Sequence, residues 1–126
     1  MKTIVQQLVD IYYLHEDWHK TYLPPKEAFN YHKTRYENGN IYVYEENGKV
    51  LGYWERYFNG DTCILYNVYV EEGYRQGRVF RELYRHFFKS MPENIKYIIG
   101  EKQRLGGKIQ KVKIGGRYGD YKTNMA

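Results

Sequence analysis

The sequence has few cysteines and no long apolar runs, the features that would indicate a disulfide-bonded or a membrane-spanning protein. Its single cysteine, Cys63, excludes an internal disulfide framework and a multi-cysteine zinc site. Its apolar runs are only a few residues long, against the about 18 that a membrane-spanning helix needs. Gln6, Gln7 and Asp10 interrupt the one apolar stretch near Met1, which argues against a secretory signal. We therefore expect no membrane association and a cytoplasmic location.

Tyrosine, by contrast, is abundant: there are 16 tyrosines, whereas alanine and serine are scarce. A buried tyrosine hydroxyl needs a partner or a wet edge, so part of the surface should be aromatic and offer a contact for a protein partner or a homodimer. The hydrophobic fraction of 42% and the charged fraction of 28% are typical of a globular chain. The length of 126 residues predicts one domain over residues 1–126.

Charge is distributed unevenly along the chain. Residues 1–73 hold 7 Lys/Arg against 11 Asp/Glu, a net charge of −4, and residues 74–126 hold 13 against 4, a net charge of +9. A basic half predicts contact with a polyanion, which is a phosphorylated cofactor, a nucleic acid or another protein. A solvated basic face is an equally good interpretation of the composition alone.

Hydrophobic periodicity predicts the order of the elements. Helical spacing predicts helices over residues 3–21 and 26–37, and alternation with Asn-Gly turns predicts an antiparallel meander over residues 40–46, 49–58 and 62–70. A polar loop then leads to a helix over residues 78–89. The next strand, residues 95–100, should lie parallel to residues 62–70 because the connection is a crossover. A short helix over residues 105–114 and an extended segment over residues 117–122 complete the order ααβββαβαβ.

The pattern H-E-x-x-H occurs once, from His15 to His19. Two histidines four residues apart on a helix face the same way and can bind zinc, with the intervening glutamate as a base. Pro24 and Pro25 break the chain too soon for the extended form of the motif, however. Two solvent-facing histidines at a polar helix end are the simpler interpretation, so we assign no metal site and keep a zinc metalloprotease as a remote alternative.

The passage from Val68 to Leu83 carries more information. A strand ends, a short polar loop follows, and a helix begins. The free N–H groups of the first helical turn, the helix dipole and the side chains of Arg75 and Arg78 form a candidate anion site, in which Gly77 permits a tight backbone. An ordinary strand-to-helix connection explains the pattern equally well on physical grounds.

This passage resembles the acetyl-CoA-binding segment of the GNAT superfamily of N-acetyltransferases, V-x-P-x-Y-R-G-x-G-[IV]-[GAF]-x-x-L. The residues in register are Val70, Tyr74, Arg75, Val79, Phe80 and Leu83. Residues 46–53 are similar to the family's strand-turn-strand "dGkivGy", and residues 114–121 are similar to its closing "lGF…dy". The resemblance implies an acyl-CoA N-acyltransferase-like fold of the α/β (α+β) class, with a mixed, mostly antiparallel sheet and helices on both faces.

The chain also departs from the family pattern. Gln76 and Arg78 stand where the family has glycine, so Arg78 either obstructs a diphosphate or replaces close backbone approach by charge. Lys111 stands where the family often has the tyrosine that protonates the leaving thiolate. The usual first strand is missing. Some bacteriophage-encoded members are similarly abbreviated and altered in this loop, and the chain is similar to them.

The resemblance implies that acetyl-CoA, as co-substrate, gives its acetyl group directly to an amine, on a small molecule or on a protein lysine or N-terminus. The residues expected to bind acetyl-CoA are Val68, Tyr69, Val70, Arg75, Gln76, Gly77, Arg78, Val79 and Phe80. Glu55 is the candidate base, and Asn67 is a candidate to orient a water. Each also fits a structural role, Glu55 as an exposed strand glutamate and Asn67 as a hydrogen-bonded strand residue.

A second class of function stays open. The altered loop, the missing acid and the basic, tyrosine-rich surface are also typical of a catalytically inactive scaffold that binds protein or nucleic acid, such as a phage structural protein. No recognisable nucleic-acid-binding motif is present.

Overall fold

The structure is a computed structural model that describes residues 2–14, 23–75, 77–102, 108–114 and 121–124, with side chains as far as residue 100. Its elements, in chain order, are α1 (Ile4–Leu14), α2 (Pro25–Glu37), β1 (Ile41–Glu46), β2 (Lys49–Asn59), β3 (Thr62–Val70), α3 (Arg78–Lys89), β4 (Tyr97–Lys102), β5 (Lys108–Ile114) and β6 (Tyr121–Asn124). Among these helices, none is long and apolar enough to cross a lipid bilayer.

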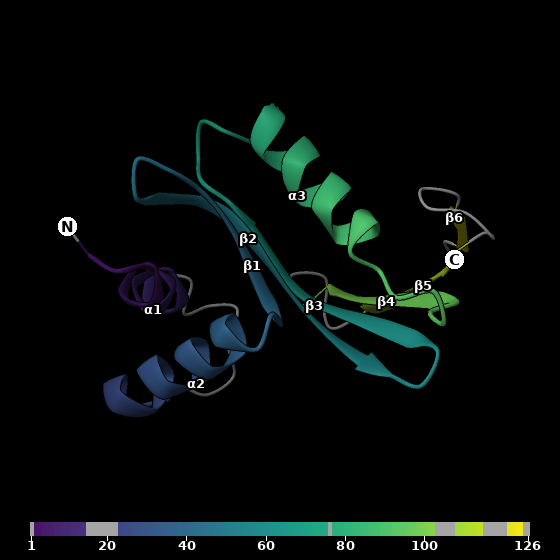
Figure 1. Ribbon diagram of the computed structural model, residues 1–126, viewed down its shortest axis with the longest axis horizontal. Coiled ribbons are helices and arrows are strands. Elements are labelled where there is room, and N and C mark those ends of the chain that lie inside the picture. The colour runs from purple at the N-terminus through teal and green to yellow at the C-terminus, as the bar shows by residue number, and fades with distance from the viewer. Residues whose placement is uncertain (1, 15–22, 76, 103–107, 115–120, 125–126) are drawn as a thin grey trace.

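The strands form one six-stranded sheet in the order β1-β2-β3-β4-β5-β6. The β3–β4 pair is parallel, from Thr62↔Tyr97 onward, and the other described neighbours are antiparallel. The helices α1 and α2 cover one face of the sheet, and α3 covers the other (Figure 1). The predicted mixed, mostly antiparallel sheet with helices on both faces is therefore confirmed, and so is the parallel crossover strand.

The predicted helix over residues 105–114 is wrong. Residues 108–114 form β5, which pairs antiparallel with β4 from Lys102↔Lys108 to Tyr97↔Lys113. Ile109, Val112 and Ile114 are β-branched and favour a strand, and the exposed edge of β4 offers their backbone a partner. The element order is thus ααβββαβββ. The remainder of the predicted first helix, residues 15–21, and most of the predicted final strand, residues 117–120, lie outside the described residues.

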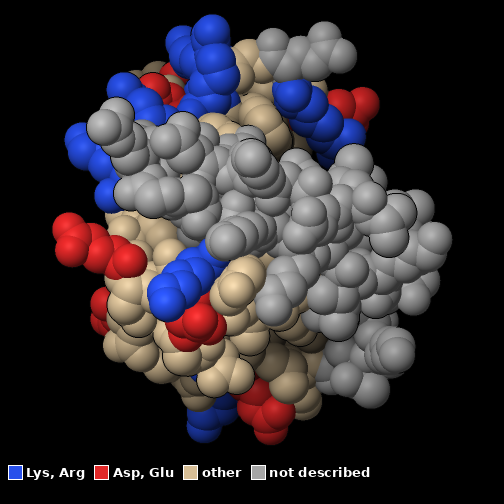
Figure 2. Space-filling model, turned by 90° about the vertical axis from the view of Figure 1, so that its right-hand side faces the viewer, with Lys and Arg blue, Asp and Glu red and all other residues tan. Residues whose placement is uncertain are grey.

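Part of the positive charge of the basic half of the sequence lies on α3. The side chains of Arg81, Arg85 and Lys89 are exposed on this helix. Figure 2 shows Lys and Arg side chains gathered at the top of the view, the end of the molecule at which α3 lies. Among the side chains that the structure describes, α3 therefore presents basic residues on its face away from the sheet.

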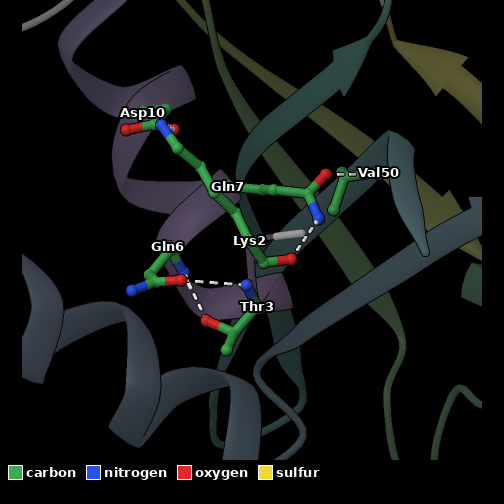
Figure 3. A network of polar contacts seen from close by, with 6 residues as sticks. All are labelled: Lys2, Thr3, Gln6, Gln7, Asp10 and Val50. Carbon is green, nitrogen blue, oxygen red and sulfur yellow. Dashed lines mark hydrogen bonds and ion pairs between the residues drawn. The ribbon is translucent and has the colours of Figure 1, made fainter.

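One amide side chain, that of Gln7, bonds the first helix to the β1–β2 hairpin. The Gln7 amide donates a hydrogen bond to the Gly48 carbonyl (2.7 Å) and accepts one from the Val50 N–H (2.8 Å), so it bonds the hairpin as a neighbouring strand would. Figure 3 shows the bond to Val50. Thr3 and Gln6 form a reciprocal capping box at the helix start, with bonds of 2.9 and 3.2 Å. The sequence pattern gives no sign of this attachment because Gln7 is read as a polar surface residue.

Each face of the sheet carries its own apolar core. The core under α1 consists of Leu8, Ile11, Ile41, Val50, Tyr53 and Tyr69. The core under α3 consists of Leu51, Trp54, Cys63, Val70, Val79, Leu83, Phe87, Phe88, Ile95 and Ile98. Gly52 lets α3 lie directly on β2, because a Cβ there would lie 2.9 Å from the Tyr69 carbonyl oxygen and 2.9 Å from Leu83 Cδ1.

A buried arginine fixes the other end of α3. Arg56 on β2 is only 5% exposed, and its guanidinium donates to the carbonyl oxygens of Phe87 (2.7 Å) and Ser90 (3.0 Å) and to Ser90 Oγ (2.8 Å). These acceptors lie at the C-terminus of the helix, where carbonyl groups lack intrahelical partners and the dipole favours a cation. With Gly52 near its start and Arg56 at its end, α3 has a fixed orientation on the sheet.

Candidate active site

The strands β3 and β4 pair over only part of their length. Their register runs from Thr62↔Tyr97 to Leu65↔Gly100 and then stops, although β3 continues to Val70 and β4 to Lys102. Over the remaining residues β3 stays paired with β2, as far as Gly52↔Val70. We call residues 66–70 of β3 the diverging segment. In this segment β3 is no longer paired with β4.

A β-bulge marks the start of this divergence. The β2–β3 register passes from Glu55↔Asn67 to Arg56↔Leu65, so Tyr66 is an extra residue on β3. A bulge bends the strand that carries it and redirects its backbone groups. Because the bulge falls directly after the last β3–β4 pair, we attribute the divergence to it.

The N-terminus of α3 follows the diverging segment after a seven-residue connection, residues 71–77, and is not capped by any side chain. Its N-cap is Gly77, the first turn has no acidic residue, and the first helical bond runs from the Arg81 N–H to the Gly77 carbonyl at 3.4 Å. The N–H groups of residues 78–80 therefore have no intrahelical acceptor and form the positive end of the helix dipole. Such an end binds phosphate groups.

Gly77 contributes in a different way from the one predicted. Its φ of −151° is open to any residue, so the backbone does not require glycine there. A Cβ added to Gly77 would meet no atom of the described chain within 4 Å. The absence of a side chain thus leaves open space in front of the free N–H groups, which is what an anion needs.

The structure answers whether Arg78 obstructs this helix end. Its guanidinium forms an ion pair with Glu46 at the end of β1, and Glu46 also accepts the Tyr44 hydroxyl (3.0 Å). Arg75 lies closer to the segment, because its Nε donates to the Val70 carbonyl at 3.1 Å. The charge of Arg78 is thus held by β1, and Arg75 supplies a cation where β3 ends.

The other predicted acetyl-CoA-binding residues differ in burial. Val68 and Phe80 are exposed, at 41% and 48%, whereas Val79, at 1%, packs in the core under α3. Tyr69 and Val70 are also buried, so these three residues offer a ligand their backbone more than their side chains. Gln76 lies outside the described residues. Burial raises the pKa of Tyr69 to about 12, and its hydroxyl donates to Glu71 at 2.9 Å.

Glu55 is not the exposed strand glutamate that we expected as its structural role. It is 2% exposed and lies under α2, where it accepts hydrogen bonds from the hydroxyls of Tyr31 (2.6 Å) and Tyr57. The two hydroxyls are 3.1 Å apart, and the Tyr57 oxygen also accepts from Arg35 Nε at 3.3 Å. We call Glu55, Tyr31, Tyr57 and Arg35 the Glu55 cluster.

The cluster lies beside the bulge. Asn67 is the register partner of Glu55 on β3, and directly paired residues of antiparallel strands point to the same face. The Tyr57 ring meets the ring of Tyr66, the bulge residue, edge-on with centroids 6.1 Å apart. The structure thus brings Glu55 and Asn67 together, on the α2 side of the point where β3 leaves β4.

Burial and the neighbouring Glu55 carboxylate keep the Tyr31 and Tyr57 hydroxyls protonated. Burial, and after it the neighbouring Glu55 charge, raises the pKa of Tyr31 far above its usual value. Burial and the hydrogen bond to Glu55 likewise raise the pKa of Tyr57. Both hydroxyls therefore act as donors to the carboxyl group at neutral pH.

Sequence reasoning missed Tyr31, Arg35 and Tyr57, although part of the signal is present. Tyr31 and Arg35 are four residues apart on one helix, and Glu55 and Tyr57 are two apart on one strand, so each pair shares a face. What the sequence does not give is which helix face lies on which strand face.

Two histidines make stability depend on pH. Burial lowers the pKa of His32, and burial and then the charge of Arg56 lower the pKa of His86. A histidine whose folded pKa lies below its unfolded value binds fewer protons when folded, so stability is lost as pH falls below about 6.5.

We expect the free energy of unfolding in urea to fall steadily from about pH 7.5 to about pH 5.5, before most carboxylates titrate. His86 stacks on Tyr42 with centroids 3.6 Å apart, so His86→Phe keeps a ring there and should reduce the slope. A slope of the opposite sign, or one that His86→Phe leaves unchanged, would contradict this assignment.

Comparison with known proteins agrees with the geometry. Residues 4–102 match the Acetyltransferase (GNAT) family. The chain belongs to this family. The matched range includes α1 through β4, and thus the diverging segment, the N-terminus of α3 and the Glu55 cluster. Comparison with curated proteins and with solved structures gives no match.

Membership settles the fold and supports acetyltransferase activity in general terms. The chain has the acyl-CoA N-acyltransferase-like fold that the resemblance implied, and GNAT proteins are acetyltransferases that generally use acetyl-CoA and an amine acceptor. The H-E-x-x-H pattern at residues 15–19 lies outside the described residues. Within the part of the chain that is described, no three His, Cys, Asp or Glu side chains gather in a way that could hold a metal ion.

Proposed function

We propose that the protein is an acetyl-CoA-dependent N-acetyltransferase that moves the acetyl group directly to an amine. One observation supports this most strongly: the bulge at Tyr66 parts β3 from β4, and the diverging segment leads to the uncapped N-terminus of α3. The same short region thus offers strand backbone for an extended thioester arm and a phosphate site for its far end.

The proposed contacts to acetyl-CoA follow from this arrangement. The backbone N–H groups of residues 78–80, the open space at Gly77 and the Arg75 guanidinium would hold the diphosphate. The backbone of Val68, Tyr69 and Val70 would run beside the thioester arm, and its N–H groups would polarise the carbonyl. Gln76 and Phe80 complete the proposed site, and Arg78 contributes its backbone N–H while its side chain stays with Glu46.

Glu55 is the proposed base, and it acts through a phenol. Because Glu55 is buried and bonded to Tyr31 and Tyr57, an amine at the bulge meets a hydroxyl first. The amine nitrogen attacks the thioester carbon and gives its proton to the Tyr57 oxygen, while Tyr57 passes its own proton to Glu55. The C–N bond forms, the C–S bond breaks, and the thiolate takes a proton from water. The proton on Glu55 then returns to the solvent, which neutralises the hydroxide and restores the carboxylate. Asn67, beside Glu55, orients the amine or an intervening water.

We expect Glu55→Gln to lower the rate of acetyl transfer about a hundredfold, because general bases contribute on this scale. Tyr57→Phe should cost a similar factor, and the double variant little more, since both changes break one proton path. Neither change should alter acetyl-CoA affinity. Release of the CoA thiol, followed with a thiol reagent, measures the rate. Burial raises the pKa of the single cysteine thiol, Cys63, to about 11, which keeps it unreactive in this assay.

The control is Glu45→Gln, an exposed glutamate on β1 that should leave the rate unchanged. Additive losses in the double variant would show that Tyr57 and Glu55 act independently. Full activity of Glu55→Gln would refute the base assignment.

A catalytically inactive scaffold is the second candidate, and the exposed face of α3 favours it. Phe80 and Tyr84 are exposed there at 48% and 40%, beside Arg81 and Arg85, which suits a polyanion or a protein partner, including a second copy of the chain. Binding of single-stranded oligonucleotide without any binding of acetyl-CoA would favour this candidate. A cytoplasmic location and similarity to abbreviated bacteriophage-encoded members remain part of the proposal, the latter supported by the altered loop at Gln76 and Arg78.

A further inference from the structure

Arg35 is held in one orientation by Tyr31 and Tyr57 of the Glu55 cluster. Its guanidinium carbon lies 3.9 Å from the centroid of the Tyr31 ring, and its Nε donates to the Tyr57 hydroxyl at 3.3 Å. The side chain is half-buried on the last turns of α2. Stacking and one hydrogen bond fix the plane of the guanidinium, so little entropy remains to be lost when it binds a ligand.

Within the described part of the chain, the two terminal nitrogens of Arg35 have no hydrogen-bond partner. Among the described residues, no carboxylate lies within ion-pair distance of Arg35, and its hydrogen bond uses Nε rather than a terminal nitrogen. Glu55, the nearest buried acid of the cluster, is bonded to Tyr31 and Tyr57 instead. Within the described ranges of the chain, the two terminal NH₂ groups therefore remain for a planar anion, which a guanidinium binds with two parallel hydrogen bonds.

The position of Arg35 relates it to the reacting amine. Tyr57, to which it is bonded, pairs with Ile64 on β3, within two residues of the bulge at Tyr66. The phosphate site lies beyond the opposite end of the diverging segment, at α3. An acceptor at the bulge would thus have its amine near the phenols and its other end near Arg35, away from acetyl-CoA.

We propose that the acceptor is an amine that carries its own carboxylate, an amino acid, and that Arg35 binds this carboxylate. The inference rests on the proposed acetyl transfer. The amine and the carboxylate of an amino acid are one carbon apart, and Tyr57 and Arg35 are likewise direct neighbours. An acceptor amine that lacks a carboxylate would leave the Arg35 guanidinium without an anion to bind. An amino acid supplies an amine to the Tyr57 hydroxyl and a carboxylate to the Arg35 guanidinium.

The test compares two matched pairs of amines that differ only in the carboxylate: L-phenylalanine against phenethylamine, and glycine against methylamine. For each, CoA thiol release gives KM, and calorimetry with the N-acetylated compounds in the presence of CoA gives Kd. We expect the wild-type protein to favour the carboxylate member of a pair by about tenfold or more, as charge-assisted bidentate bonds are strong. Arg35→Gln should abolish this preference, whereas Lys33→Gln, an exposed cation on the same helix, should keep it.

Equal binding of the two members of both pairs, no binding of any of them, or a preference that survives Arg35→Gln would each overturn the inference. Acetyl-CoA affinity, measured in the same preparations, should be the same in wild type and Arg35→Gln. A protein that binds acetyl-CoA but shows no carboxylate preference refutes the acceptor class alone. A protein that does not bind acetyl-CoA refutes the proposed function itself.

Discussion

Gly77→Asp should weaken acetyl-CoA binding about a hundredfold and at the same time stabilise the fold, because charge-assisted hydrogen bonds are each worth about 1.5 to 3 kcal/mol. An aspartate at the N-cap places its carboxylate on the free N–H groups of residues 78–80, where it competes with and repels a diphosphate. The same contact should raise the free energy of unfolding by about 0.5 kcal/mol, since Asp is a better N-cap than Gly and favours the helix dipole. Calorimetry gives the affinity, and urea unfolding gives the stability.

The opposite signs of the two effects separate this prediction from simple damage. The added side chain meets open space, so no clash is expected. Gly77→Ser is the matched control, because serine caps the helix without charge and should weaken binding by a smaller factor. Unchanged acetyl-CoA affinity in Gly77→Asp would show that the phosphate groups bind elsewhere, and lower stability would show that residue 77 is not the N-cap.

Arg56→Met should lower the free energy of unfolding by about 3 kcal/mol or more, because each hydrogen bond of a charged donor is worth about 1.5 to 3 kcal/mol. Methionine keeps apolar contact with the rings of Trp54, Phe58 and Phe87, whose centroids lie 4.2, 5.2 and 5.1 Å from the guanidinium carbon. It leaves the carbonyls of Phe87 and Ser90 without their donor. Urea unfolding at neutral pH measures the loss.

Arg81→Met is the control for Arg56→Met, since Arg81 is exposed on α3, the helix that Arg56 anchors, and its replacement should change stability by less than about 0.5 kcal/mol. Equal effects of the two substitutions would mean that Arg56 does not anchor α3. Because the proposed phosphate site lies at the start of α3, Arg56→Met should also weaken acetyl-CoA binding under conditions in which the protein is still folded.

The sequence was sufficient for most of the fold because local signals agreed. The Asn-Gly turns at residues 47–48 and 59–60 set the meander, and the apolar stripe of residues 78–89 set α3. The parallel pairing of β4 followed from the crossover rule. The strand β5 was misassigned because its seven residues are too short for periodicity to decide between helix and strand. What decides is the open edge of β4, a feature of the tertiary fold.

The candidate site was predictable in its backbone but not in its side chains. A candidate anion site could be proposed, because a strand, a loop and a basic helix are consecutive in the sequence, and the structure shows that the start of this helix has no side-chain cap. The burial of Glu55 could not, because it depends on how α2 lies across the sheet and brings Tyr31 to the carboxyl group. The redirection of Arg78 toward Glu46 likewise joins residues 32 positions apart in the sequence.

Titration of the protein with acetyl-CoA tests the central claim most directly. With a diphosphate bound at the start of α3 and the thioester arm beside residues 66–70, we expect a one-site isotherm that Gly77→Asp weakens and Glu55→Gln leaves intact. No heat and no spectral change at millimolar acetyl-CoA, from a protein shown to be folded, would contradict it and leave the GNAT fold without the transferase chemistry.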